Sequence, residues 1–296
     1  MVVHGLLLSV QLAFASLPVA GKIVMRTLSP NGLALARIAG AATFFLIAYA
    51  MRRPLRRVPW RDVVRIAALS LVGVAGNQLL FLTGLSNTTA INASVLISTI
   101  PVFAVAIAVL LRRERARVAL LAGVALSFCG VLSLIGAEAF STNAATMIGD
   151  LLIAANALLY ASYLVLVRGV LERHGPTVVI ALAFAFGTLF TIPFGAAELA
   201  RGLPALTPSA WAVLAFIVLV PTIFTYFANA WALRHARASL VAIYTTTQPV
   251  ATAVMAVVWL GEALTPRVFA AAVLIVLGIV LVARPDPRRV AAARLR

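Results

Sequence analysis

The chain has 296 residues, of which 63% are hydrophobic and only 11% are charged. Because a soluble domain must present many water-compatible residues, this composition excludes an ordinary soluble protein and predicts a chain that lies in a lipid bilayer. The formal net charge is +16, so the placement of the basic residues needs an explanation of its own.

Apolar stretches of about 20 residues recur along the whole chain, which is the length that crosses about 30 Å of hydrocarbon as a helix. Runs of this length exclude a porin-like barrel, whose strands of about 10 residues alternate in polarity. Read from charge to charge, the sequence predicts an all-α integral membrane protein with ten spans, at residues 3–22, 31–51, 66–85, 91–111, 118–136, 147–167, 177–197, 210–232, 239–260 and 267–283.

The basic residues predict the orientation of these spans. With ten crossings and a cytoplasmic N-terminus, nineteen of the 24 lysines and arginines fall in cytoplasmic segments, as the positive-inside rule requires. Both termini are therefore predicted to be cytoplasmic, and the bacterial inner membrane is the natural location. The remaining basic residues are Lys22, Arg26, Arg37, Arg201 and Arg267.

The positive charge also indicates which molecules the protein is expected to bind. The arginines lie on short predicted loops rather than on one contiguous face interleaved with aromatic residues, so nucleic acid is not expected as a partner. Anionic lipid headgroups are the natural counterions at the cytoplasmic surface. A monomer is expected, with a homodimer as the alternative.

A spaced pattern, L-x4-A-x10-P-x12-E, occurs twice, 148 positions apart. It divides the chain into a first five-helix repeat at 1–140, a second at 141–283 and a basic tail at 284–296. Since five crossings are an odd number, the second repeat is predicted to be inverted relative to the first, the arrangement that permits alternating access around a central cavity. The copies are Leu85, Ala90, Pro101 and Glu114, then Leu233, Ala238, Pro249 and Glu262.

Several segments together resemble one family. Leu28-Ser29-Pro30 precedes the second span, Arg37 lies within it, Gly149-Asp150 opens the second repeat, and each repeat carries a Pro-to-Glu segment. The chain is similar in these features to the EamA-type drug/metabolite transporter superfamily, and within it to bacterial exporters of amino acids and related metabolites, aromatic amino acids among them. The resemblance implies a basket of ten helices, with the first, third, fourth, sixth, eighth and ninth around the cavity.

Polar residues deep within the spans predict the substrate site, because an unpartnered amide or hydroxyl in an apolar medium costs roughly 1 to 3 kcal/mol. Hydrogen bonding between helices is the alternative interpretation, and for single Ser and Thr residues it is the favoured one. Amides have four hydrogen-bonding sites, and tyrosines combine a ring with a hydroxyl. The predicted substrate-binding residues are Gln11, Asn77, Gln78, Asn156, Tyr160, Tyr163, Tyr244 and Gln248.

Four residues of the repeated pattern receive roles of another kind. Pro101 and Pro249 remove backbone hydrogen bonds inside the fourth and ninth spans, so we expect them to act as hinges or gates. Glu114 and Glu262 are interpreted as interfacial residues that satisfy helix ends or a nearby arginine, because charged groups at span ends are ordinary.

The carboxylates and histidines bear on energy coupling. None of the eight carboxylates is predicted near the middle of the bilayer, and the three histidines lie near span ends or in loops. Since proton-driven transport usually relies on a buried Asp, Glu or His, a uniporter or exchanger is favoured over a proton antiporter. Lys22 and Arg37 are the only basic groups that could reach an anionic substrate, and snorkelling to the outer interface is the preferred interpretation for Lys22.

Two other classes of function, a membrane enzyme and an ion channel, are alternatives to a transporter. A membrane enzyme needs an acid, base, nucleophile or metal cluster, and the sequence predicts no catalytic residue, metal site or cofactor. An ion channel predicts rings of charge or a repeated carbonyl filter, and neither is visible in the sequence. The predicted function is export of neutral or aromatic amino acids and related small metabolites, with a multidrug or other metabolite exporter, proton-coupled or not, as the alternative.

Overall fold

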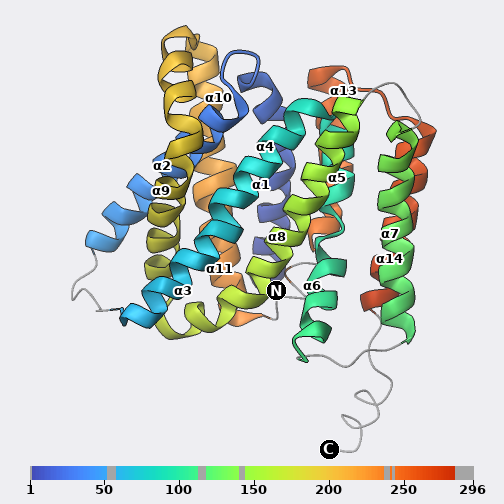
Figure 1. The fold of residues 1–296 in the computed structure, drawn as a ribbon, viewed down its shortest axis with the longest axis horizontal. Coiled ribbons are helices and arrows are strands. Elements are labelled where there is room, and N and C mark those ends of the chain that lie inside the picture. Colours follow the sequence, from blue (N-terminus) through green and yellow to red (C-terminus); the bar gives the residue numbers. More distant parts are fainter. Residues whose placement is uncertain are drawn as a thin grey trace, which may run out of the picture.

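The computed structural model describes residues 2–51, 58–112, 118–139, 144–236, 241 and 244–283, and every element within these ranges is helical (Figure 1). Seven segments are long and apolar enough to cross a membrane, and three shorter apolar helices accompany them. In chain order the elements are α1 Val2–Val24, α2 Pro30–Ala50, α3 Trp60–Ser70, η1 Leu71–Gly76, α4 Asn77–Asn87, α5 Ala90–Ile97, α6 Ile100–Leu110, α7 Val118–Ala139, α8 Ala144–His174, α9 Pro176–Gly202, η2 Leu203–Ala205, α10 Pro208–Val218, η3 Leu219–Phe224, α11 Thr225–His235, η4 Tyr244–Thr247, α13 Gln248–Leu260 and α14 Pro266–Ala283.

Several predictions fall on residues outside the described ranges. These are the boundary between the two repeats at 140/141, Glu114 and Ala238 of the repeated pattern, and the basic tail 284–296.

Two helix pairs form the ends of the molecule. The most extensive packing between helices is that of α2 against α9 and of α7 against α14. The two pairs lie at opposite ends, with α1, α4 and α8 between them (Figure 1). Small residues permit the close approach: Gly195 faces the backbone of Asn31, and Gly278 faces Ser127.

The described elements of the first half, apart from α5, have counterparts in the same order in the second half, which also contains the 3₁₀ turns η2 and η4. The contacts correspond as well, because α1 packs against α13 while α8 packs against α6. Five elements of the first half begin 148 positions before their counterparts in the second, at Trp60 and Pro208, Leu71 and Leu219, Asn77 and Thr225, Ile100 and Gln248, and Val118 and Pro266.

Two of these counterparts, η1 and η3, are π-helical insertions in the middle of long helices. In η3 the cause is Pro221, which has no N–H to give to the carbonyl of Ile217. The hydroxyl of Thr222 donates to that carbonyl instead, at 2.7 Å. In η1 the corresponding residue is Gly73, and the ring of Tyr163 packs where a Cβ would stand.

The fourth and ninth predicted spans are interrupted next to their prolines. α5 ends at Ile97, and α6 begins at Ile100 with Pro101 in its first turn. The 3₁₀ turn η4 precedes α13, which has Pro249 in its first turn. Each proline therefore lies at the start of a half-helix, where a missing N–H is tolerated.

Polar contacts join helix ends that are distant in the sequence. Glu262 accepts hydrogen bonds from the backbone N–H groups of Ala90 at 2.8 Å and Ile91 at 3.0 Å, so its carboxylate caps the N-terminus of α5. The Ser29 hydroxyl donates to Glu198 at 2.5 Å. Glu262 therefore satisfies a helix end, as predicted, and its position at the membrane interface stays a prediction.

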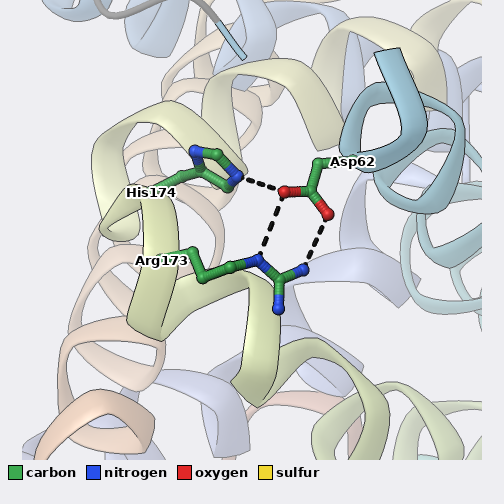
Figure 2. A network of polar contacts seen from close by, with 3 residues as sticks. All are labelled: Asp62, Arg173 and His174. Carbon is green, nitrogen blue, oxygen red and sulfur yellow. Dashed lines mark hydrogen bonds and ion pairs between the residues drawn. The ribbon is translucent and has the colours of Figure 1, made fainter. Parts of the chain in front are cut away.

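A second group of contacts joins the start of α3 to the end of α8 (Figure 2). Arg173 donates to both carboxylate oxygens of Asp62, from Nη2 at 2.7 Å and from Nε at 3.2 Å. His174 Nε2 lies 2.6 Å from Oδ2 of the same carboxylate. Two neighbouring residues of α8 thus hold one residue of α3.

Candidate functional site

The helices between the two end pairs enclose a cavity. It comprises about 440 Å³ of space not occupied by protein atoms, counting the part that is open to the outside. Its lining residues come from α1, α4, α5, α6, α8, α11 and α13, which make up the six predicted spans that the family resemblance assigns to a cavity. They are Phe14, Leu17, Asn77, Gln78, Phe81, Ile97, Ile100, Asn156, Tyr160, Tyr226 and Gln248.

Three aromatic rings form one wall of the cavity. The ring of Phe14 lies 6.5 Å from that of Tyr160 and 6.1 Å from that of Tyr226, and the two tyrosines are 6.5 Å apart. All three pairs meet edge to face, at 73° to 79°. Such a cluster gives a ligand both ring faces and the two tyrosine hydroxyls.

Asn77 and Asn156 tie α4 to α8 at the cavity. Nδ2 of Asn156 donates to the backbone carbonyl of Asn77 at 2.7 Å, and Nδ2 of Asn77 lies 3.5 Å from the carbonyl of Asn156. Each amide thus contacts the backbone of the other helix. Hydrogen bonding between helices therefore accounts for the Nδ2 atom of each side chain. Both residues nevertheless also line the cavity.

A buried arginine lies directly behind the lining. Arg37 is 0% exposed. Its Nε donates to Thr222 Oγ1 at 3.1 Å and its Nη2 to the carbonyl of Pro221 at 3.4 Å, which anchors it on η3. Its Nη1 donates to Gln78 Oε1 at 2.5 Å, and Gln78 Nε2 donates to the Tyr226 hydroxyl at 2.7 Å.

A second amide pair joins α1 to α13. Gln248 Nε2 donates to Gln11 Oε1 at 2.5 Å, and only Gln248 of the two lines the cavity. Nε2 of Gln11 is buried with no hydrogen-bond partner among the described residues. Asn229 Nδ2 donates to the hydroxyl of Tyr160, another lining residue, at 2.8 Å.

The structure brings together five of the eight predicted substrate residues, since Asn77, Gln78, Asn156, Tyr160 and Gln248 line one cavity. Their role in binding substrate stays a prediction.

The other three predicted residues do not line the cavity. Gln11 lies behind Gln248, and Tyr163 stacks on Tyr160 at 6.2 Å between ring centroids. Tyr244 bonds to His4 at 2.5 Å, because the 3₁₀ turn η4 places it one turn before α13 begins.

Two residues outside the predicted substrate-binding set are prominent in the structure. Arg37, named above with Lys22 as a basic group that could reach an anionic substrate, is completely buried against η3 and α4. Tyr226 lines the cavity and bonds to Gln78, which occupies the equivalent position of the first half, 148 residues earlier. The repeat offset, applied to Gln78, is the signal that would have selected Tyr226.

The profile of the EamA-like transporter family matches this chain twice, at residues 2–136 and 147–284. The chain belongs to the EamA-like transporter family. The resemblance drawn from the sequence is thereby confirmed, and this EamA-like chain is a multi-pass membrane protein.

Named relatives agree with that assignment. An uncharacterized transporter of Archaeoglobus fulgidus is 32% identical over 262 residues, which are 88% of this chain and 89% of the relative. A probable terminal-alkyne amino-acid exporter of Streptantibioticus cattleyicolor is 30% identical over 256 residues, 86% of this chain and 84% of the relative. The family and these names indicate that this EamA-like chain is a transporter rather than an enzyme.

A solved crystal structure shares the fold of this EamA-like transporter. It superimposes with a TM-score of 0.66 at 19% sequence identity and covers 95% of this chain and 96% of that one. At this identity the likeness concerns the fold alone.

Proposed function

We propose that this EamA-like transporter exports neutral or aromatic amino acids and related small metabolites through the described cavity by alternating access. The observation that carries the proposal is the composition of the cavity wall, which combines four amides with aromatic and aliphatic side chains from both halves of the chain. Amides suit the polar groups of an amino acid, and rings suit an apolar side chain. The relative named as a probable terminal-alkyne amino-acid exporter supports the same substrate class.

The proposed topology has ten spans in two inverted five-helix repeats, with both termini in the cytoplasm of a bacterial cell and anionic lipids at the arginine-rich side. The helix-end contacts support it, because each joins segments that this topology puts on the same side of the membrane. Asp62 and Arg173 are both cytoplasmic in it, whereas Glu262 and Ala90 are both external. The family profile, which matches each half separately, supports the duplication.

The cavity lies where the halves meet, which supports its role as the central pathway. Two pairs of lining residues occupy equivalent positions 148 residues apart, namely Gln78 with Tyr226 and Ile100 with Gln248. Rearrangement of one half relative to the other would therefore open the same site to either side. The breaks beside Pro101 and Pro249 adjoin this wall and are the proposed hinges.

Uniport or exchange is the proposed mode of coupling. Among the eleven lining residues there is no carboxylate and no histidine to carry a proton. Asp150 is fully buried, but it accepts hydrogen bonds from Thr88 and Asn92 at the junction of α4, α5 and α8, and it does not line the cavity.

Export of aromatic xenobiotics by the same fold is the second candidate. The edge-to-face wall of Phe14, Tyr160 and Tyr226 favours it, since ring surfaces bind apolar amines as readily as amino-acid side chains.

Counterflow into proteoliposomes tests the proposal. Purified protein is reconstituted in liposomes loaded with one unlabelled solute, and accumulation of the labelled solute is followed for the neutral and aromatic amino acids and for aromatic amine drugs. We expect amino acids to accumulate, and we expect Gln78→Ala, Asn156→Ala and Gln248→Ala to slow that accumulation while the proteins remain folded. Unaltered transport in all three variants would reject the site, and accumulation of drugs alone would favour the second candidate.

A further inference from the structure

We propose that Arg37, Gln78 and Tyr226 form a one-way chain of hydrogen-bond donors that makes the cavity select solutes carrying a carboxylate, which binds at the Tyr226 hydroxyl. The inference rests on the proposed export function, because it names the substrate class of the same cavity.

Arg37 sets the donor-to-acceptor direction of these hydrogen bonds. Its guanidinium has only donors, so the atom of Gln78 that meets Nη1 at 2.5 Å must be the amide oxygen. The amide nitrogen of Gln78 is thereby turned toward Tyr226, 2.7 Å from the hydroxyl oxygen. That oxygen must act as the acceptor, because both hydrogens of the amide are donors.

The Tyr226 hydroxyl consequently retains a hydrogen to donate. No acceptor for it lies within hydrogen-bond distance in the part of the chain that the structure describes, since the bond from Gln78 is the hydroxyl's one polar contact there. Tyr226 lines the cavity, so an acceptor atom of a bound solute can complete the chain. A carboxylate oxygen accepts more strongly from such a hydroxyl than a neutral oxygen does.

The positive charge of Arg37, at the start of this chain of hydrogen bonds, favours the binding of an anion. Arg37 is fully buried, and its three hydrogen bonds go to neutral groups on Thr222, Pro221 and Gln78. Arg37 forms no ion pair with any residue that the structure describes. A buried cation without a counterion stabilises a negative charge that enters its surroundings.

Only one half of the molecule carries this charge. The position 148 residues after Arg37 is Ala185, and none of the residues that line the cavity is charged. The site is therefore polarised, with its positive side at Gln78 and Tyr226. The rings of Phe14 and Tyr160 offer faces to the ammonium end of an amino acid in the same cavity.

The test compares matched solutes that differ at the carboxylate. Wild-type protein in proteoliposomes is assayed by counterflow with phenylalanine, phenylalaninol and phenethylamine, and with leucine, leucinol and isopentylamine. We expect each amino acid to be transported about tenfold or more faster than its alcohol and amine, the ratio that one charge-assisted hydrogen bond provides.

Two variants examine the donor chain itself. Gln78→Glu has the same shape, pairs with Arg37 and neutralises it, so the ratio of acid to amine should fall to about twofold or less. Tyr226→Phe removes the terminal donor and keeps the ring, and it should lower the same ratio by several-fold even if Gln78→Glu does not fold. Asn87→Asp, which adds the same charge at the exposed end of α4, is the matched control and should keep the wild-type ratio.

The outcomes separate the two proposals. If folded wild-type protein moves acids, alcohols and amines alike, or if the ratio persists in both Gln78→Glu and Tyr226→Phe, the donor chain does not select carboxylates and the inference is overturned. If folded wild-type protein moves none of the six solutes, the proposed function fails, and the inference fails with it.

Discussion

Gly73 shows how a single missing side chain shapes the neighbourhood of the cavity. Its backbone lies in the π-helical insertion η1, and the Cβ, Cγ and Cδ2 atoms of Tyr163 occupy the space where its own Cβ would stand. Tyr163 in turn stacks on Tyr160, which lines the cavity. The cavity wall is therefore supported from behind by a contact that only glycine allows.

We predict that Gly73→Ala destabilises the protein by about 1 to 3 kcal/mol, because the added methyl group must displace the ring of Tyr163 from a packed position. Thermal unfolding in detergent measures this. Gly169→Ala on α8 is the matched control, since its nearest neighbour is the end of Arg173 at 3.8 Å, and it should be neutral or slightly stabilising. Equal melting temperatures for the two variants would contradict the predicted role of the close contact.

At the residue scale, the sequence indicates types of residue better than their orientations. Asn77, Gln78 and Asn156 were predicted because amides within apolar spans need partners. Arg37 lies inside the protein because acceptors meet it there, namely Gln78 on α4 and the π-helical insertion of Pro221 and Thr222. That local geometry depends on packing between helices, so periodicity alone could not reveal it.

The interrupted helices are the most distinctive elements of the fold. α5 and α6 meet at Ser98 and Thr99, whose hydroxyls donate to the carbonyls of Val95 and Leu96, at 2.6 Å in each case. These bonds add to those that the backbone N–H groups of Ser98 and Thr99 make to the same two carbonyls. Pro101 has no N–H to continue the helical ladder from α5 into α6.

We predict that Pro101→Ala and Pro249→Ala slow transport by several-fold while leaving the protein as stable or more stable, since alanine restores an N–H and favours a continuous helix across the hinge. Initial rates of counterflow and melting temperatures are measured together. Pro208→Ala, at the exposed first turn of α10, replaces a proline where no hinge is proposed and should keep the wild-type rate. If this control slows transport as much as the other two variants, the hinge assignment is wrong.

The locations of the long helices were easier to predict than the irregularities within them. Apolar runs between charges located the long helices, because their length follows from the thickness of the bilayer. Two of them are interrupted beside Pro101 and Pro249, and the action of these prolines as hinges stays a prediction. The π-helical insertions were not predicted, since η1 contains no proline and the contact of Gly73 with Tyr163 joins distant segments.

At the scale of the whole molecule, the duplication explains why one cavity gathers residues so distant in the sequence. Gln78 and Tyr226 are equivalent positions that bond to one another, and Ser127 donates at 3.3 Å to the carbonyl of its own counterpart, Ile275. Contacts between equivalent residues are expected where two halves meet around a pseudo-two-fold axis. The cavity and the α7–α14 pair both have this property.

The proposed inverted arrangement makes a prediction about sidedness, because residues 148 positions apart should then reach opposite faces of the membrane. Single cysteines are introduced after Cys129 is replaced by serine, at four exposed positions near helix ends. Ser86→Cys and Ser209→Cys should react with a membrane-impermeant maleimide in intact bacterial cells. Their counterparts Arg234→Cys and Arg61→Cys should react only after the membrane is permeabilised.

Labelling positions in pairs discriminates better between topologies than labelling single loops does. Each pair compares equivalent ends of corresponding helices, α4 with α11 and α3 with α10. A parallel duplication would label both members of a pair from one side, and that result would exclude the inverted topology. Opposite labelling of both pairs would instead establish that the halves enter the membrane in opposite directions. Exchange of conformations between the halves would then open the cavity to one side and then to the other, as alternating access requires.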